Sequence, residues 1–474
     1  MRRRSVLRQL LDSGPGRLGI AAFFVLALLS LYVVATYPAD FGPARWSNPA
    51  VWSDNPRAAP PAWTNRFGAV RRPVHQVIGA DEPTATQAAG PAQVQRFELP
   101  FEHHADAPPT FLSFTLSNVA YHTRPPQYLL VLHRPDGTSV QLAREVVAGP
   151  RPGESAPYRR HFETPQRLLL SGASALPEAV AQLFAASYPE AADAAALRAR
   201  PLAALFGVPT ADGGLAPLHG AYLLEVRFTV ADAEDRVASV QAVVGGAVYG
   251  WFGTDALGRD LAEGLLFGLP IALLIGLLAS TLSTVIGTAF GLLGGFVGGR
   301  TDLVIQRVAD VIANVPVLPL LIFLVFILGS RLWLILAILV AFSWPGLTIV
   351  VRSMVLPLRS SPEVDAARTL GASTGHIIWR HVFPHTAPFV FAQLIFFAPG
   401  AILAEAGLSF LGLGDPSLPT WGQILEHGFR TGAVFLGYWW WVVPPGLLIV
   451  LTALTFMLLA LGMETVVNPR LRRV

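Results

Sequence analysis

The sequence contains no cysteine and no lysine, and each absence excludes a class of chemistry. Without cysteine the chain has no disulfide, no thiolate metal site and no cysteine nucleophile. All 34 basic residues are arginine, so the chain lacks the lysine with which a Walker A loop reaches the β- and γ-phosphates of a nucleotide. The chain is therefore not itself a P-loop ATPase, and any energy from ATP must come from a partner.

Charge is also scarce. Only 14% of the residues are charged, against roughly 25% in ordinary soluble proteins. Hydrophobic residues make up 53% of the chain and gather in long uncharged runs between arginine-bearing loops. This pattern predicts an integral membrane protein in a lipid bilayer. The formal net charge of +3 is nearly balanced, and we expect no nucleic-acid partner.

Six apolar runs are each long enough to cross a bilayer as a helix. The first has an arginine-rich start, which a cleaved signal peptide would share, but its 20 residues exceed the usual apolar core of about 7–15 residues in such peptides. We therefore predict a membrane anchor and an all-α polytopic protein. The six runs are 18–37, one within 264–299, 311–330, 332–351, 387–404 and 438–463.

The arginines predict how the chain is oriented, because cytoplasmic loops carry an excess of basic residues. With the N-terminus inside, 14 arginines fall in the inner loops and tails and two, Arg331 and Arg430, in the short outer loops. Both termini are then cytoplasmic. The expected layout is a cytoplasmic tail 1–17, a first helix 18–37, an extracytoplasmic insert 38–250, a five-helix core 251–464 with a cytoplasmic loop at 353–385, and a tail 465–474.

The long segment between the first two spans reads as a folded domain. Stretches at 95–99, 110–116, 127–132 and 221–230 are rich in β-forming residues, and 189–197 favours a helix. We predict a β-rich or α+β insert. His103 and His104 with Asp106 could ligate a metal, but adjacent histidines point to opposite sides of a strand, so we expect no metal site.

The cytoplasmic loop contains a short helix with clear ends. Ser361 suits the N-cap and Pro362 the first helical position, Glu363 and Asp365 favour the positive end of the helix dipole, and Gly371 suits the stop. A second helix is expected over about 374–383, leading through a proline into the fifth span. The first helix is too short to span a membrane, and its small alanines would let another protein approach closely.

The sequence Asp365-Ala366-Ala367, followed by Gly371 and Pro384, resembles the EAA loop of ABC importer permeases. Three ordered stretches, 251–260, 408–414 and 419–422, are similar to motifs of the C-type permease of dipeptide and oligopeptide transporters. The large insert lies outside the resemblance. Asp365 stands where the family usually has Glu, which keeps the charge. His381 is either a subfamily feature or simply a histidine near helix carbonyls.

The resemblance implies a six-helix permease subunit that forms a translocation pathway for peptides or similar small solutes in a prokaryotic inner membrane. It implies a homologous second permease, two cytoplasmic ATPase subunits that bind ATP and Mg²⁺, and an extracytoplasmic solute-binding protein. No cofactor, metal or catalytic residue is expected in this chain. The residues expected to couple to the ATPase are Glu363, Asp365, Ala366, Ala367, Gly371, His381 and Pro384.

Two further groups of polar residues are candidates for function. Asp255 and Arg259 are spaced to form an ion pair at a helix start before the second span, at the expected outer mouth, and the resemblance extends their motif to Gly258 and Asp260. Ionisable and polar groups within spans often mark a transport path. Gln393 and Glu405 lie on or near the fifth span, and Glu405 could face either a substrate vestibule or water.

Two alternatives belong to other functional classes. A secondary transporter would show internal repeats or an ionisable relay, and neither is evident. The stretch 407–410, Gly-Leu-Ser-Phe, superficially resembles an intramembrane serine protease motif, but it lacks the second glycine, and no span carries a partner histidine. The sequence does not distinguish dipeptide, oligopeptide, nickel chelate and glycoside substrates.

Overall fold

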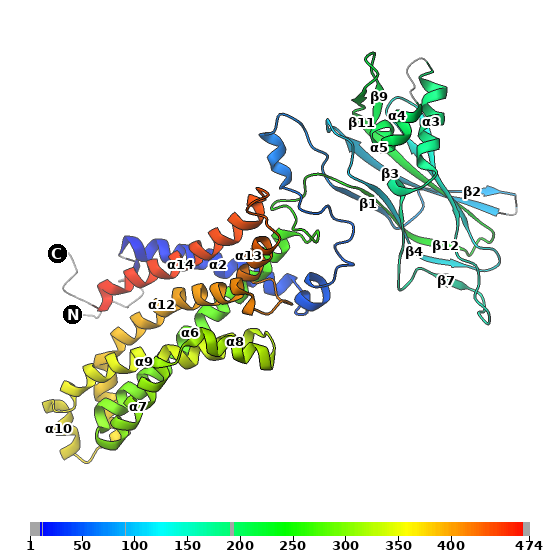
Figure 1. Ribbon diagram of the computed structural model, residues 1–474. Coiled ribbons are helices and arrows are strands. Elements are labelled where there is room, and N and C mark those ends of the chain that lie inside the picture. The colour runs from blue at the N-terminus through cyan, green and yellow to red at the C-terminus, as the bar shows by residue number, and fades with distance from the viewer. Residues whose placement is uncertain (1–9, 12, 91, 190–193, 468–474) are drawn as a thin grey trace. The chain divides into compact units, whose positions relative to one another are not determined.

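The computed structural model describes residues 10, 11, 13–90, 92–189 and 194–467 (Figure 1). These residues form two compact units. One comprises the chain before Ala50 and after Asp260, and the other is Ala50–Asp260. Several features of the sequence analysis lie outside the described residues. They are Arg2, Arg3, Arg4, Arg8, Arg470, Arg472 and Arg473, together with 190–193 of the helix expected at 189–197.

The first unit is helical. Five of its helical stretches are long and apolar enough to cross a membrane: Gly14–Thr36, Leu261–Val297, Leu332–Leu358, Thr374–Leu413 and Trp439–Met463. These match five of the six predicted runs, so the chain is a polytopic membrane protein. The elements of this unit are α2 (Gly14–Thr36), η1 (Phe41–Trp46), α6 (Leu261–Val297), α7 (Gly299–Asn314), α8 (Val317–Leu328), α9 (Leu332–Leu358), α10 (Pro362–Thr369), α11 (Thr374–Ile377), η4 (Ile378–Val382), α12 (Phe383–Leu408), η5 (Ser409–Leu413), α13 (Trp421–Arg430) and α14 (Trp439–Val467).

The predicted run 311–330 is not one straight helix. It covers the end of α7, a break at Pro316 and all of α8, and the two helices meet at a bend of 79°. The break has a local cause, because proline removes a backbone donor and disfavours helical geometry in the residue before it. A count of six spans therefore depends on treating this bent pair as one span.

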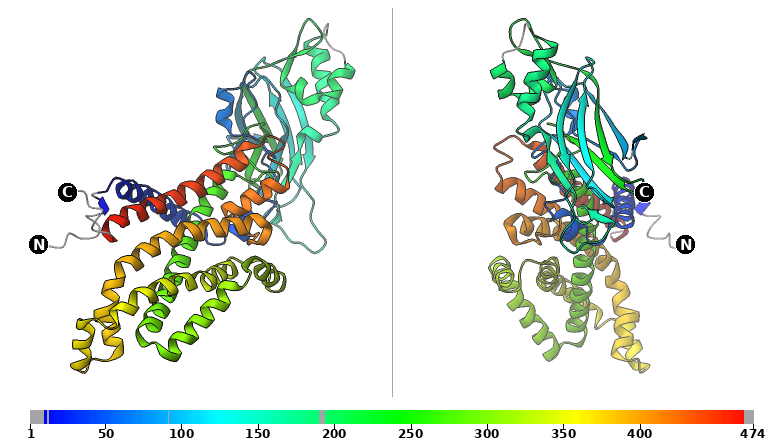
Figure 2. Two further views of the ribbon diagram at one scale, coloured as in Figure 1. Left: turned by 60° about the vertical axis from the view of Figure 1, so that its left-hand side comes forward. Right: turned by 90° about the vertical axis from the view of Figure 1, so that its right-hand side faces the viewer.

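Small residues let the long helices approach closely. Gly287, Gly291 and Gly295 recur every fourth residue and form a stripe on α6 that faces α9. A Cβ atom added to Gly291 would lie 2.6 Å from the Cβ atom of Val351. This is the small-xxx-small pattern of membrane helix packing. Helices α2 and α14 also lie side by side (Figure 2), where Gly19 meets the backbone of Leu459.

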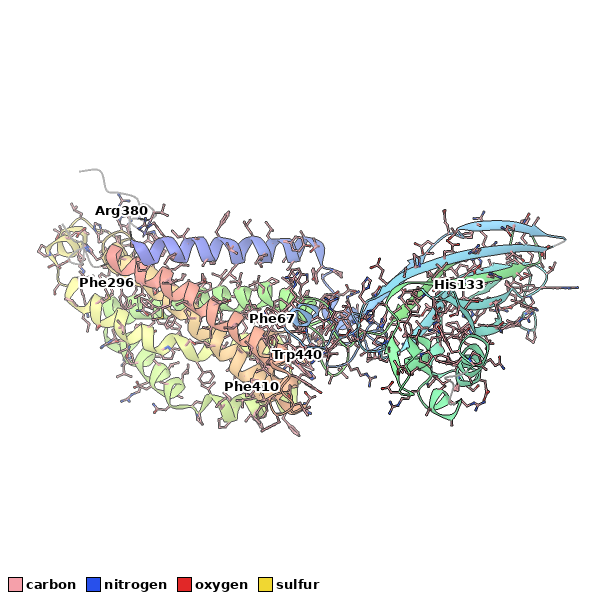
Figure 3. All side chains as sticks on the ribbon, turned by 90° about the horizontal axis from the view of Figure 1, so that it is seen from above. Phe67, His133, Phe296, Arg380, Phe410 and Trp440 are labelled. Carbon is pink, nitrogen blue, oxygen red and sulfur yellow. The ribbon has the colours of Figure 1, made fainter. Side chains whose placement is uncertain are left out.

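Labelled residues mark the two ends of the helical unit. Phe296 and Arg380 lie at one end, and Phe410 and Trp440 lie at the other (Figure 3). The guanidinium of Arg368 stacks over the Phe296 ring at 5.2 Å, so the loop with α10 belongs to the first end. Which end faces the cytoplasm stays a prediction.

The second unit contains two antiparallel sheets that enclose one hydrophobic core. One sheet has the order β1-β12-β4-β7 with β8 also on β4, and the other has the order β2-β3-β11-β5-β6. The strands are β1 (Gln76–Ala80), β2 (Ala85–Ala89), β3 (Ala92–His103), β4 (Leu112–Tyr121), β5 (Gln127–His133), β6 (Ser139–Val146), β7 (Tyr158–Arg160), β8 (Gln166–Leu169), β9 (Gly207–Pro209), β10 (Leu215–Pro217), β11 (Gly220–Val230) and β12 (Arg236–Val244). The helices are η2 (Ala62–Arg66), η3 (Leu170–Gly172), α3 (Leu176–Ser187), α4 (Ala194–Ala199) and α5 (Pro201–Leu205).

The four β-rich stretches of the sequence lie in or next to the start of the long strands β3, β4, β5 and β11. Their alternating apolar side chains fill the core between the sheets, as in Phe97 and Leu99 of β3. The adjacent histidines do point to opposite sides: His103 is buried against Phe206 and Tyr222, whereas His104 is exposed. Within the described ranges, no group of three His, Asp or Glu side chains is placed to hold a metal.

Candidate functional site

The helix α10 has the ends that its sequence predicts. Ser361 is the N-cap, and its hydroxyl accepts a hydrogen bond from the backbone N–H of Val364 at 3.4 Å. Pro362 begins the helix, and Glu363 and Asp365 occupy its first turn. Gly371 follows the helix with a φ of +79°, which L side chains rarely adopt. The result is an eight-residue helix at the end of α9.

One face of α10 is packed against the membrane helices. Val364 and Ala367 are buried in a cluster that includes Phe296 of α6 and Val355 of α9. Ala367 therefore faces its own chain, contrary to the prediction that it offers a close approach to another protein. Spacing explains the difference, because residues three apart share one helix face. The opposite face, which carries Ala366, is exposed.

A carboxylate connects α10 to the helix that begins at Thr374 and continues into α12. Glu363 Oε1 lies 3.0 Å from Nδ1 of His381, and Oε2 lies 3.3 Å from Nε2 of His385. These hydrogen bonds, from His381 first and then His385, lower the pKa of the Glu363 carboxyl. His385 was not singled out in the sequence, although its spacing of four from His381 indicates a shared helix face. The three residues are called the Glu–His clamp below.

The remaining coupling candidates lie around the clamp. Pro384 is the second residue of α12 and directly follows the π-helix η4, where its missing N–H interrupts the regular hydrogen-bond pattern. The helix expected over 374–383 is present as α11 followed by the π-helix η4, and it continues directly into α12. Asp365 is exposed and lies 3.4 Å from Nη1 of Arg368. Leu370, at the end of α10, is 88% exposed, which is unusual for an apolar side chain beside a polar helix.

The motif expected at an outer mouth forms a closed loop rather than a helix start. The Asp255 carboxylate accepts hydrogen bonds from the backbone N–H groups of Leu257 and Arg259, each at 2.9 Å. It also forms an ion pair with the Arg259 side chain. An antiparallel bridge between Thr254 and Asp260 closes the loop, and α6 begins only after it. Asp255 and Arg259 are both buried.

A second chain segment holds this loop in place. The Thr254 hydroxyl donates to the carbonyl of Pro56 at 2.6 Å, and the Asn55 side chain donates to the carbonyl of Gly258 at 2.9 Å. The backbone of Gly258 has a φ of +82°, and an added Cβ atom would lie 3.0 Å from the carbonyl oxygen of Trp52 and 3.2 Å from that of Asn55. The loop 254–260 and the segment 55–59 therefore form one tightly bonded structure within the β-rich unit.

The two candidate pathway residues have different surroundings. Glu405 is 3% exposed, and the Ser409 hydroxyl donates to its Oε1 at 2.7 Å. Gly422 of α13 packs against the same turn, so that an added Cβ would lie 2.8 Å from the Ser409 Cβ. Glu405 thus faces neither a vestibule within this chain nor water. Gln393, on α12, is half-buried.

Residues 287–473 match the family described as the binding-protein-dependent transport system inner membrane component. The dipeptide transport system permease protein DppC of Bacillus subtilis is 35% identical over 224 residues, which cover 47% of this chain and 69% of that protein. The probable peptide ABC transporter permease protein y4tQ of Sinorhizobium fredii is 36% identical over 226 residues, or 47% of this chain and 76% of that protein. The chain belongs to this permease family.

A third relative agrees. The oligopeptide transport system permease protein OppC of Bacillus subtilis is 34% identical over 224 residues, covering 47% of this chain and 72% of that protein. The resemblance seen in the sequence is thereby confirmed, and the protein is a membrane-spanning permease subunit of an ABC importer. The family match includes α10 and the Glu–His clamp.

Proposed function

We propose that this permease imports peptides or similar small solutes and that α10 couples it to separate cytoplasmic ATPase subunits. The substrate class is supported by the names of the relatives, which are dipeptide, peptide and oligopeptide permeases. The coupling role is supported chiefly by one observation. Helix α10 is fixed on one face by Val364 and Ala367, while its other face, with Asp365 and Ala366, is open.

In this proposal the complex contains a homologous second permease, two ATPase subunits and an extracytoplasmic solute-binding protein. ATP and Mg²⁺ are bound by the ATPase subunits, since the permease has no lysine for a Walker A loop. Movement of the ATPase subunits displaces α10, and the Glu–His clamp passes that displacement to α12. The permease itself performs no covalent chemistry. Neither the secondary transporter nor the intramembrane enzyme is favoured by the family match.

The proposed pathway runs along α12. Gln393 lines it, with Pro388 and Pro399 in the same helix providing points at which α12 can bend. Glu405, buried and bonded to Ser409, fixes the end of α12 farthest from α10 rather than touching the solute. The loop of Asp255, Gly258, Arg259 and Asp260 stabilises the last segment of the insert before the second span begins.

In the same proposal six spans cross a prokaryotic inner membrane with both termini cytoplasmic, and α7 and α8 together make the third crossing. The folded domain within 38–250 is then extracytoplasmic. We propose that it shields the outer mouth or docks the solute-binding protein there.

The experiment that tests the coupling role uses two glycines of the same loop. Gly371→Val places a β-branched residue at a φ of +79°, so the turn after α10 must change. Gly375→Val is the matched control, because Gly375 lies in α11 with ordinary helical geometry and open space around it. Both variants should reach the membrane. Only Gly371→Val should lose ATPase copurification and solute-stimulated ATP hydrolysis, and equal behaviour of the two variants would contradict the coupling role.

A further inference from the structure

Exposed aromatic side chains gather on the β-rich unit from two segments far apart in the sequence. Phe67 is 82% exposed and Trp251 is 78% exposed. The indole N–H of Trp63 donates to the carbonyl of Trp251 at 2.9 Å, and the Trp63 and Phe67 rings meet edge to face at 6.3 Å. Phe252 is also exposed. These four side chains are called the aromatic patch. Trp63 contacts both Phe67 and Trp251, and Phe252 follows Trp251 in the chain.

Three arginines lie beside the aromatic patch. Arg66, Arg71 and Arg72 line an open cleft of about 730 Å³ and are themselves exposed. Two acids, Glu102 and Asp106, line the same cleft. Both are engaged, because Asp106 accepts the backbone N–H of Arg71 at 2.7 Å and Glu102 Oε2 lies 2.9 Å from Nε2 of His104. The cleft therefore presents an excess of guanidinium groups next to exposed aromatic rings.

Covalent continuity keeps the patch close to a membrane span. The bridge between Thr254 and Asp260 brings those residues to about 5 Å from one another. Phe252 is two residues before Thr254, and each residue adds at most roughly 3.6 Å. The backbone of Phe252 thus lies within roughly 12 Å of Asp260, and α6 begins at the next residue. A group within that distance of a spanning helix can reach the headgroup layer.

We propose that the aromatic patch and its three arginines bind phospholipid headgroups and seat the β-rich unit on the bilayer surface. Aromatic side chains, Trp and Tyr above all, favour the membrane–water interface, because their rings are apolar bodies with polar edges. Arginine binds phosphate oxygens through its planar fork of donors. The bound surface is lipid, with stronger binding to anionic than to zwitterionic headgroups. This inference depends neither on the transported solute nor on which side of the membrane the unit occupies.

The absence of native cysteine makes a site-specific test direct. Val70 is 56% exposed and lies between Phe67 and Arg71, so Val70→Cys can carry an environment-sensitive fluorophore while the patch stays intact. Ser155→Cys is the matched control. Ser155 is exposed and lies shortly before β7, which pairs with the Tyr121 end of β4. The patch lies near the other end of β4, because Trp251 follows Val244, the partner of Leu112. Ten residues of β4 separate the two ends, roughly 33 Å.

The full-length permease is reconstituted alone in phosphatidylglycerol or phosphatidylcholine vesicles. We expect the label at position 70 to be quenched by headgroup nitroxide lipids and shielded from aqueous iodide, and the label at position 155 to show the reverse. Replacing Arg66, Arg71 and Arg72 with glutamate should weaken lipid quenching mainly in phosphatidylglycerol. Iodide quenching at position 70 equal to that at position 155 would overturn the proposal. So would shielding that appears only when a solute-binding protein is added.

Discussion

The Nδ1 atom of His381 lies 3.0 Å from one carboxylate oxygen of Glu363, 18 residues earlier in the chain. The other carboxylate oxygen faces Nε2 of His385 at 3.3 Å. Because Glu363 belongs to α10 and both histidines stand where the chain enters α12, a single carboxylate connects the exposed helix to a membrane helix. The apolar contacts of Val364 and Ala367 hold α10 in place beside it.

Removing this carboxylate should weaken coupling without preventing membrane insertion. Glu363→Ala leaves α10 held by its apolar face and by Arg368 over the Phe296 ring, and we expect a several-fold loss of solute-stimulated ATP hydrolysis at unchanged permease abundance. Glu363→Gln keeps hydrogen bonding but not charge, and its loss should be smaller. Asp310→Ala is the matched control, since Asp310 is an exposed acid on α7 that pairs with Arg307 of the same helix. An equal loss in Asp310→Ala would assign the effect to surface charge.

The clamp also predicts a direction of pH dependence. The pKa of Glu363 is lowered in the folded protein, so its contribution to stability is complete above the ordinary glutamate pKa of about 4.3 and is lost as the pH falls through the lower folded value. The difference in thermal midpoint between the wild type and Glu363→Gln should therefore shrink only in strongly acidic solution. The double variant His381→Ala and His385→Ala should abolish this dependence. A difference that grew on acidification would contradict the sign.

The two alanines of the EAA-like loop should behave differently. Ala366→Arg adds a large side chain to the exposed face of α10, so we expect normal stability but binding to the ATPase weakened by about tenfold. Ala367→Arg forces a charge into the cluster with Phe296 and should lower the free energy of unfolding by at least about 2 kcal/mol. Thermal unfolding in detergent and copurification separate the two effects. Ala186→Arg, on an exposed helix position in the β-rich unit, controls for added charge.

Close packing beside Glu405 predicts that the stability of the permease is sensitive to the size of residue 422. A Cβ atom at Gly422 would lie 2.5 Å from the carbonyl oxygen of Ala406 and 2.8 Å from the Ser409 Cβ. Gly422→Ala should therefore destabilise the permease by about 1–3 kcal/mol, the usual cost of overpacking. Gly407→Ala, one residue after Ala406, has open space at its Cβ and should be neutral or slightly stabilising. Equal thermal midpoints for the two variants would rule out the tight contact.

The sequence predicted the features that depend on local pattern. The limits of α10 follow from Ser361, Pro362 and Gly371, and five long helices follow from uncharged runs. Features that depend on distant partners were missed. Ala367 shares a helix face with Val364, which the spacing shows, but the spacing does not show that Phe296 and Val355 cover that face.

Long-range hydrogen bonds account for the other differences. The loop of Asp255 and Arg259 is held in place by hydrogen bonds from Asn55 to Gly258 and from Thr254 to Pro56. Each bond joins residues about 200 positions apart, which spacing alone could not reveal. Glu363 was expected to interact with its own helix dipole, yet its partners are the two histidines of the next helices. The His381–His385 spacing was the one available signal for that contact.

The predicted orientation can be tested with two exposed serines on the cysteine-free background. Ser155→Cys lies in the β-rich unit, and Ser360→Cys lies in the loop before α10. Ser360 is preferred to Ser361 because Ser361 caps the helix. An impermeant thiol reagent should label position 155 in intact cells and position 360 only after permeabilisation. The reverse pattern would show that the count of arginines gave the wrong sidedness.

The proposed role of the insert can be tested by a deletion whose two ends lie close together in the sheet. Gln76 of β1 and Val244 of β12 are directly opposed in an antiparallel pair, so their Cα atoms are about 5 Å apart. Replacing 76–244 with a short Gly/Ser linker removes both sheets while retaining the bonded segments around Thr254. If the insert docks the solute-binding protein, the complex should assemble with normal ATPase attachment, while binding-protein affinity and uptake at low solute concentration fall. As a control, the same linker inserted after Gly137, in the turn between β5 and β6, leaves both sheets in place. Unchanged uptake kinetics in the deletion variant would make the insert dispensable for transport, because the linker restores the chain connection and removes only the domain.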